Sequence, residues 1–264
     1  MSCPNCFKGE ILAGEPTGTI SIQGAYYAQS AEPSTRAVIL FTDIFGLRLK
    51  NSKILADFFA EQLKCDVWVP DLFDGKPPVE VHEMKVPERI GEKIGFFGYL
   101  SFIWLALRRL PLIIHSWPSV VDRRVTTFIE RLKAEKKYEK LGAVGYCFGG
   151  NAAVRFGGTS LIDTIVVCHP GKVPIGQLKA IKVPSSWACA EEDMSFTPDA
   201  RAAAEAELAG RRGKDNYVEY EFIEHKGTTH GFAARPNLAY PEVKAGFEAA
   251  LQQTVEWFKK TLLD

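Results

Sequence analysis

Short apolar runs and amphipathic segments alternate along most of the chain. The runs are rich in β-branched residues and carry few charges, which is typical of strands buried on both faces of a sheet. They lie at 36–42, 65–70, 140–146, 163–168 and 183–190, and 217–223 alternates like a further strand. Apolar residues recur at helical spacing at 54–63, 116–133, 198–208 and from Pro241 onward. Strands that alternate with helices from residue 36 onward predict an α/β protein with a mostly parallel sheet covered by helices on both sides.

Single residues place several boundaries. Asn51 or Ser52 is expected to cap the helix that follows the first buried strand. Thr197 is expected to cap the Ala-rich helix at 198–208. Gly24 interrupts a strand-like stretch at 19–27, which predicts a hairpin at the edge of the sheet. No repeat or linker divides the chain, so we expect residues 1–264 to form a single domain.

The charges balance, which excludes some classes of function. The chain has 264 residues with 32 basic and 32 acidic side chains. This balance gives no electrostatic case for binding nucleic acid or an anionic membrane surface. The first ten residues lack the apolar core of a signal peptide, so the expected location is cytoplasmic.

The six cysteines are expected to be free thiols, because a cytoplasmic chain of this size does not need disulfides. Cys65, Cys168 and Cys189 lie in apolar runs and are expected in the core. Cys3 and Cys6 form one C-x-x-C without a second pair or a nearby histidine, which makes a poor zinc site. The sequence has no dense cluster of metal ligands, so we expect no metal and no cofactor.

The segment 86–115 is the least regular part of the chain. Residues 94–107 include no charged side chain, and Arg108 and Arg109 then end the run. The run is too short to span a bilayer, which takes about 20 residues. We favour a buried helix; a lid or pocket wall is the functional alternative, and an interfacial membrane helix is the least favoured. As a lid, the segment would supply substrate contacts from Phe96, Phe97, Phe102 and Trp104.

The candidate nucleophile is Cys147. The sequence Gly145-Tyr146-Cys147-Phe148-Gly149 follows an apolar run and precedes a helical segment, which is the pattern of a nucleophile elbow with Cys in place of Ser. A sharp turn from strand to helix lifts the sulfur out of the sheet, and glycines let the backbone turn without a clash. The positive end of the helix favours a thiolate and presents the Phe148 N–H to a developing oxyanion.

An acid and a base follow in the order that this elbow requires. Asp193 comes just after the strand predicted to end near Ala190, and His230 follows the strand predicted to end near Ile223. His225 lies between two charged residues and is interpreted as solvated. The competing acids and the other pocket histidine are Glu191, Glu192, Asp199 and His169. A Cys147-His230-Asp193 triad is therefore the predicted catalytic group.

The loop after the first buried strand should supply the second oxyanion donor. Ile44 N–H is the candidate, opposite Phe148 N–H. Asp43 would then lie near Cys147, where its carboxylate could accept the thiol proton or simply cap the next turn. Both roles stay open.

At these residues the chain resembles the dienelactone hydrolase family of carboxymethylenebutenolidase-like proteins. The matching pieces are TDIFG at 42–46, VPDLFDG at 69–75, GYCFGG at 145–150, AEED at 190–193 and THGFAAR at 229–235, and CHPG at 168–171 points to the fungal branch. The resemblance implies an α/β-hydrolase fold, with a doubly wound, mostly parallel sheet flanked by helices. It also implies a Cys-His-Asp triad and the opening of an enol-lactone to a keto-acid without a cofactor.

Two departures from the family pattern concern the substrate. Bacterial members carry Glu at the position of Asp43, and an Arg four residues after the triad histidine. Here that position is Ala234, and Arg235 follows it as the candidate carboxylate binder. We therefore expect a cysteine-dependent hydrolase of a small lactone or activated ester, although not necessarily of dienelactone. The alternative is a hydrolase fold without activity that serves as a ligand-binding or interaction protein.

Overall fold

One sheet runs through the computed structural model, which describes residues 11–21, 23–84 and 86–264. Its eight strands have the order β1-β2-β4-β3-β5-β6-β7-β8. Strands β3 to β8 pair in parallel, whereas β2 pairs antiparallel with both β1 and β4. The strands are β1 (Thr19–Ile20), β2 (Tyr26–Ala28), β3 (Arg36–Phe41), β4 (Asp66–Val69), β5 (Lys140–Tyr146), β6 (Thr164–Cys168), β7 (Ser185–Glu192) and β8 (Tyr220–Thr229). The predicted α/β class and parallel sheet are confirmed.

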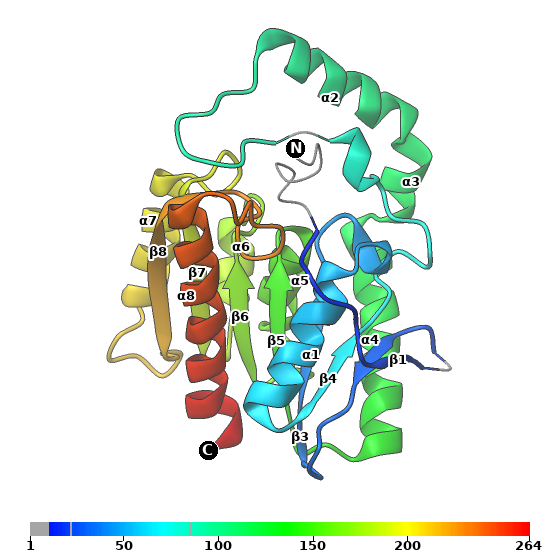
Figure 1. Cartoon of the computed structure of the whole chain (residues 1–264). Helices are drawn as coiled ribbons and strands as arrows, with labels where there is room; N and C mark the ends of the chain where they lie inside the picture. Colours follow the sequence, from blue (N-terminus) through cyan, green and yellow to red (C-terminus); the bar gives the residue numbers. More distant parts are fainter. Residues whose placement is uncertain (1–10, 22, 85) are drawn as a thin grey trace.

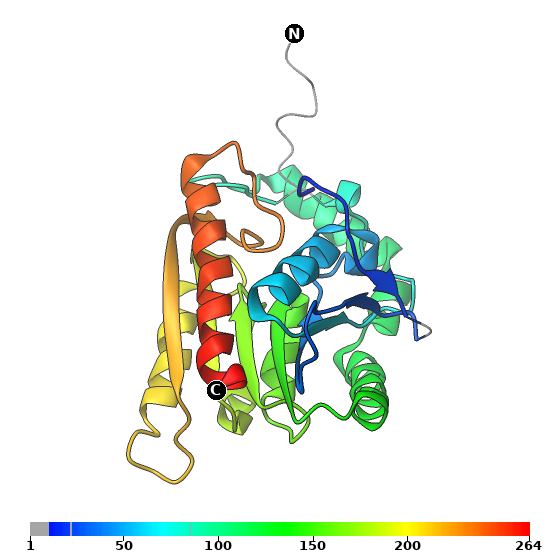
Figure 2. The ribbon, with the colours of Figure 1, turned by 60° about the horizontal axis from the view of Figure 1, so that its bottom comes forward.

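Helices cover both faces of this sheet (Figure 1). The helices are α1 (Asn51–Leu63), α2 (Phe96–Arg108), α3 (Leu110–His115), α4 (Pro118–Lys136), α5 (Phe148–Phe156), α6 (Ile175–Ala180), α7 (Pro198–Ala209) and α8 (Pro241–Phe258). Helices α1 and α8 contribute to the hydrophobic cluster on one face, and α4, α5, α6 and α7 to the cluster on the other. Figure 2 shows α1 and α8 again on a common side of the sheet.

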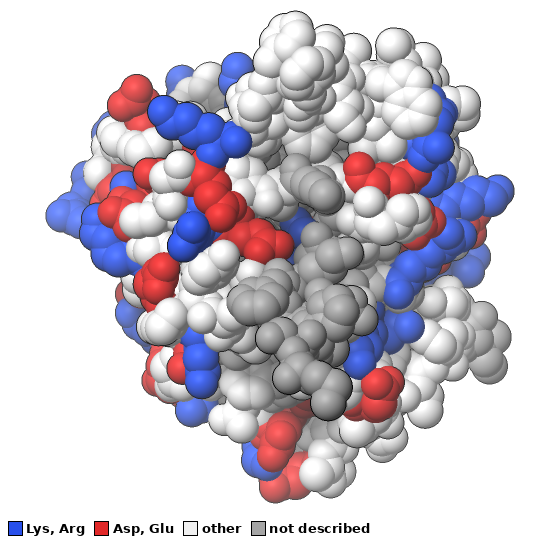
Figure 3. All heavy atoms as spheres, turned by 45° about the horizontal axis from the view of Figure 1, so that its top comes forward, with Lys and Arg blue, Asp and Glu red and all other residues white. Residues whose placement is uncertain are grey.

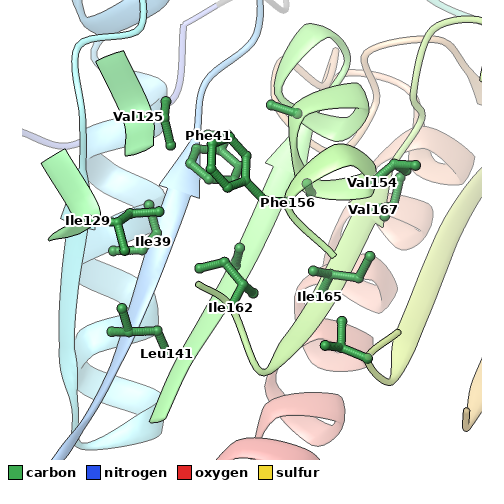
Figure 4. Close-up of a cluster of buried hydrophobic side chains, with 14 of the residues drawn as sticks. Ile39, Phe41, Val125, Ile129, Leu141, Val154, Phe156, Ile162, Ile165 and Val167 are labelled. Atoms are coloured by element: carbon green, nitrogen blue, oxygen red, sulfur yellow. The ribbon is translucent and has the colours of Figure 1, made fainter. Parts of the chain in front are cut away.

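Strand β3 is apolar at successive positions because both of its faces are covered. Ile39 and Phe41 point into the cluster with α4 and α5, whereas Val38 and Leu40 point into the cluster with α1 and α8. Successive side chains of a strand face opposite sides, so a central strand covered on both sides is apolar at every position. Figure 4 shows the first of these clusters, in which Phe41 lies beside Phe156.

Several boundaries differ from the sequence prediction. Neither Asn51 nor Ser52 caps α1, because its N-cap residue is Lys50. The Asn51 side chain instead accepts a hydrogen bond from Leu12 N–H (3.0 Å) and donates one to Ala234 O (2.9 Å), so it ties distant loops together. Thr197 does cap α7, since its hydroxyl accepts from Ala200 N–H at 3.3 Å.

The expectation of a buried helix at 94–107 is wrong. Leu105 is the single buried residue of α2. The physical reason is position: both faces of the sheet are already covered, and α2 lies beyond the strand ends, at the top in Figure 1. There it meets the rest of the fold along one side only.

The core cysteines lie as expected, since Cys65, Cys168 and Cys189 are buried free thiols. Cys3 and Cys6 lie outside the described residues. Among the described residues, no helix combines the length and apolar character that crossing a bilayer requires.

Candidate active site

Cys147 occupies a sharp turn between β5 and α5. Its backbone has φ 52° and ψ −112°, a conformation that non-glycine residues rarely adopt and that costs on the order of 1–3 kcal/mol. The turn needs close backbone contacts: a Cβ at Gly145 would lie 2.0 Å from Gly149 O, and a Cβ at Gly149 would lie 2.2 Å from Phe41 O. The glycines of the motif are therefore fixed by packing as well as by the turn.

His230 lies in hydrogen-bond contact with both other residues of the predicted triad. Its Nε2 is 3.1 Å from Cys147 Sγ, and its Nδ1 is 2.9 Å from Asp193 Oδ2. Asp193 is held in turn, because its Oδ1 accepts from Ser195 N–H (2.7 Å) and Phe196 N–H (3.0 Å). The strands run further than predicted, so Asp193 and His230 directly follow β7 and β8. Three residues from separate loops thus meet at the carboxyl edge of the sheet.

This arrangement favours an ion pair. Burial lowers the pKa of His230, but the neighbouring Cys147 sulfur and the Asp193 carboxylate together raise it from 6.5 to about 10. Burial raises the pKa of Asp193, but its hydrogen bond to His230 and its backbone donors bring it below the ordinary value. A cationic imidazole between an anionic carboxylate and a sulfur is therefore the stable charge arrangement.

His169 is a neighbour of the site that the sequence indicated only as a residue that could line the pocket. It is fully buried, and its ring centroid lies 5.2 Å from that of His230 in a T-shaped contact. Among the described residues, neither of its ring nitrogens has a hydrogen-bond partner. Burial, reinforced by the charge of His230, holds the pKa of His169 well below 6.5. A neutral ring therefore packs against the candidate base.

The interpretation of His225 as solvated is wrong. This residue is 5% exposed, and its Nε2 lies 2.8 Å from Gln253 Oε1. Burial lowers the pKa of His225. Its neighbours in the chain are charged, but β8 is packed against α8, so one side of the strand is covered however polar the local sequence is.

The two candidate oxyanion donors lie on adjacent backbone segments. Phe148 is the first residue of α5, and Ile44 lies in the turn directly after β3. The close approach of Gly149 to Phe41 O and Thr42 O brings these segments together. In the described part of the chain, neither N–H donates to another group outside the regular ladders of helices and strands. These two N–H groups therefore remain the candidate donors to an oxyanion.

Asp43 makes two side-chain contacts, a cap and an ion pair. Its Oδ1 accepts from Phe45 N–H at 3.1 Å, which is the capping role, and its Oδ2 lies 3.1 Å from Arg235 Nε. Arg235 therefore does not project freely toward a substrate: its side chain is 5% exposed, and its guanidinium lies 4.5 Å from the centre of the Phe45 ring. The loop that carries His230 is fastened in this way to the loop that carries Ile44.

A cavity of about 440 Å³ opens beside His230. Its apolar wall includes Ile94 and Tyr99 from the 86–115 segment and Met194 from the loop after β7. Its lining also includes the acidic side chains of Glu92, Glu191 and Glu192. Lys93 and His230 are the basic residues of the described lining.

The predicted aromatic contacts do not line this cavity. Phe96, Phe97 and Trp104 are 72%, 83% and 60% exposed, and Phe102 is half-buried away from the cavity lining. The reason is that their helix presents them to solvent, whereas Ile94 precedes the helix and Tyr99 lies on its flank. The apolar character of 94–107 indicated a special segment, but not which of its side chains face the site.

The residues before α2 cross the strand ends as a strap. Thr229 Oγ1 donates to Pro87 O (2.9 Å), and Gly91 N–H donates to Glu192 Oε2 (2.9 Å). These bonds attach the strap to the ends of β8 and β7, next to His230 and Asp193.

Among the described residues, no group of three or more His, Cys, Asp or Glu side chains could hold a metal ion.

A parallel sheet of this order, with an elbow after β5 and a histidine after the last strand, defines an α/β-hydrolase. The chain matches the model of the Dienelactone hydrolase family over residues 109–262. It is 31% identical to Hydrolase tropI of Talaromyces stipitatus, over 98% of this chain and 96% of that protein. It is 30% identical to Hydrolase pyvD of Aspergillus violaceofuscus, over 97% of this chain and 96% of that protein.

A Klebsiella pneumoniae protein assigned as a dienelactone hydrolase shares the fold. The two structures superpose with a TM-score of 0.68 at 14% identity, covering 89% of this chain and 92% of the other. The chain belongs to the dienelactone hydrolase family and is a hydrolase of the ester or lactone type. The resemblance in the sequence motifs is confirmed.

Proposed function

We propose that this hydrolase opens a lactone or activated ester through Cys147 as nucleophile, His230 as proton shuttle and Asp193 as the group that orients His230. The observation that carries this proposal is the continuous contact from Asp193 through both ring nitrogens of His230 to the Cys147 sulfur. A nucleophile, a base and an orienting acid in this geometry are what covalent acyl transfer requires.

The thiolate attacks the carbonyl carbon, and the electron pair of the carbonyl bond moves onto oxygen. The N–H groups of Ile44 and Phe148 are proposed to stabilise this oxyanion. As the oxyanion collapses, the bond to the ring oxygen of the lactone breaks and His230 donates its proton to that oxygen. His230 then accepts a proton from water, whose oxygen attacks the thioester. The acid is released and the thiolate returns.

The cavity beside His230, whose described lining does not include Cys147, is proposed to hold a neutral, apolar acyl group. Arg235 is committed to Asp43, and in the cavity lining the four carboxylates of Glu92, Glu191, Glu192 and Asp193 outnumber the two cations Lys93 and His230, which opposes an anionic substrate. Ile94 and Tyr99 offer apolar surface on the opposite wall. We infer that residues 86–115 act as a pocket wall of a single domain, through the strap rather than through the exposed aromatic residues.

The experiment compares Cys147→Ala with the matched variant Cys189→Ala, which removes a buried thiol outside the site. With a panel of lactones and p-nitrophenyl esters, Cys147→Ala should lose on the order of 10³-fold or more in kcat. Cys189→Ala should retain its rate. Full turnover by Cys147→Ala would exclude this mechanism.

Two further measurements separate the alternatives. Stoichiometric release of p-nitrophenol in a burst, followed by steady turnover, and the loss of both in Cys147→Ala, distinguishes an enzyme from an idle fold that only binds ligands. In a series of esters of rising chain length, kcat/KM should increase roughly fourfold per added CH₂ over the first carbons, since each is worth about 0.8 kcal/mol. A preference for carboxylated lactones would contradict the proposed specificity and leave the triad untouched.

A further inference from the structure

Helices α2 and α3 carry an exposed apolar surface, which we call the α2–α3 face. Of the eighteen large hydrophobic residues that are exposed in the described chain, ten lie between residues 96 and 117. They are Phe96, Phe97, Tyr99, Leu100, Ile103, Trp104, Leu107, Leu110, Ile114 and Trp117. Figure 3 shows a broad uncharged area at the edge of the molecule where α2 lies. Scattered exposed apolar residues are ordinary, but a contiguous group of this size marks an interaction surface.

The spacing on this face is that of a helix pair. Phe96, Leu100, Ile103 and Leu107 follow one another at intervals of four, three and four residues, which is the seam spacing of packed helices. α2 ends at Arg108, and the exposed residues Leu110 and Ile114 of the separate helix α3 extend the apolar surface beyond it. All six residues are exposed, between 45% and 72%. Such a seam is expected where a second helix lies alongside.

The inner side of α2 already has its contact. Leu105 packs in a small cluster with Phe45, Leu49 and Val79, next to the loop after β3. Arg108 and Arg109 both pair with Glu83, which fixes the end of the helix. The seam therefore cannot turn inward without breaking these contacts, and it stays available to a partner.

The area of the face matches a stable dimer. An aromatic side chain offers about 150–250 Å² in all, so ten large apolar residues that are roughly half exposed present on the order of 1,000 Å². The largest apolar patch of an ordinary monomer is about 300–600 Å², and a standard interface buries about 800 Å² on each partner. The exposed area is thus beyond what a monomer normally shows and sufficient for a specific complex.

The charges favour a second copy over a lipid surface. Helices that lie on anionic membranes combine an apolar face with many flanking Lys and Arg residues. Here residues 94–107 carry no charge, Arg108 and Arg109 are committed to Glu83, and the chain has no net charge. A neutral apolar seam complements itself, and identical surfaces that pair with each other give the twofold dimers commonest among soluble proteins.

We propose that the α2–α3 face is a homodimer interface, in which α2 of one copy packs along α2 of a second copy. Tyr99 belongs both to this face and to the lining of the cavity beside His230. The interface therefore borders the active site, and the second copy holds the pocket wall in place. This inference rests on the exposed seam and not on the proposed reaction.

The experiment measures the mass of the full chain by sedimentation velocity across a range of concentrations. Ile103→Glu and Leu107→Glu place a charge in the centre of the seam, and Ile175→Glu is the matched control, because Ile175 is an equally exposed apolar residue on α6. We expect dimers for the wild type and Ile175→Glu, and monomers for both seam variants. Circular dichroism spectra should be the same for all four proteins.

Three results would overturn the inference. The first is a wild-type chain that stays monomeric at every concentration. The second is a dimer that both seam variants retain. The third is a wild-type monomer that co-floats with neutral phosphatidylcholine vesicles when the Ile103→Glu variant does not. That result would assign the α2–α3 face to lipid.

Discussion

The buried pair between Arg235 and Asp43 gives a quantitative test of how the site is held together. The two side chains are 5% and 2% exposed, and Arg235 also covers the Phe45 ring. Replacing Arg235 by Ala leaves the Asp43 carboxylate buried without a counter-charge. Breaking a buried pair from one side costs about 3–5 kcal/mol, so Arg235→Ala should lose that much free energy of unfolding.

Urea denaturation followed by circular dichroism measures this loss, and unchanged m values would show that the denatured state is the same. At about 2 °C per kcal/mol for a chain of this size, Tm should fall by roughly 6–10 °C. Arg36→Ala is the control, because Arg36 pairs with Glu139, which is 63% exposed. An exposed pair of this kind contributes at most about 1 kcal/mol.

A double-mutant cycle separates the pair from its surroundings. Asp43→Asn keeps the cap on Phe45 N–H but removes the charge, so the loss in Asp43→Asn/Arg235→Ala should be smaller than the sum of the two single losses by more than about 1 kcal/mol. The reasoning is refuted if Arg235→Ala is as stable as Arg36→Ala and instead raises KM for carboxylated substrates alone. That result would make Arg235 a substrate ligand.

The remaining predictions address the base, the elbow, the ring beside the base and a helix cap. The pKa of His230 is raised to about 10 in the folded chain, so its contribution to stability is complete below pH 6.5 and is lost as pH rises through about 10. The difference in unfolding free energy between wild type and His230→Gln should shrink over that window in urea titrations. Gly149→Ala should fail to give active, stably folded protein in a thermal melt, because its Cβ would lie 2.2 Å from Phe41 O. His169→Phe should keep kcat within about tenfold if the ring acts only by packing, whereas a shifted pH–rate profile would reveal an electrostatic role. Thr197→Ala should cost about 1 kcal/mol by urea denaturation with unchanged kcat, since only the cap of α7 is lost.

Strand and helix positions could be predicted because they depend on neighbours in the chain. The run at 36–42 is apolar at every position, and a strand with that pattern is stable only when both of its faces are covered. The glycines around Cys147 signal a sharp turn for a similarly local reason. Because the carboxyl ends of parallel strands meet at one edge, the chain order of Cys147, Asp193 and His230 was sufficient to predict that they meet. Their catalytic roles stay a proposal.

The partners of single charged or polar residues could not be predicted, because burial is decided by elements far apart in the sequence. The sequence makes Arg235 a candidate carboxylate binder, yet the loop after β3 supplies Asp43 as its partner from 192 residues away. His225 reads as solvated, yet α8 covers it and supplies Gln253.

In the apolar stretch 94–107, too, the local sequence predicted the helix but not its burial. Its sequence determined a helix without charge, because composition and spacing act within the segment. Whether that helix would be buried depended on free space over the sheet, which other helices had already taken. The sequence therefore determined the elements, the elbow and the order of the site residues. Which side chains face the cavity, which pair with each other and which stay exposed was settled by the packing of distant segments, which local sequence does not encode.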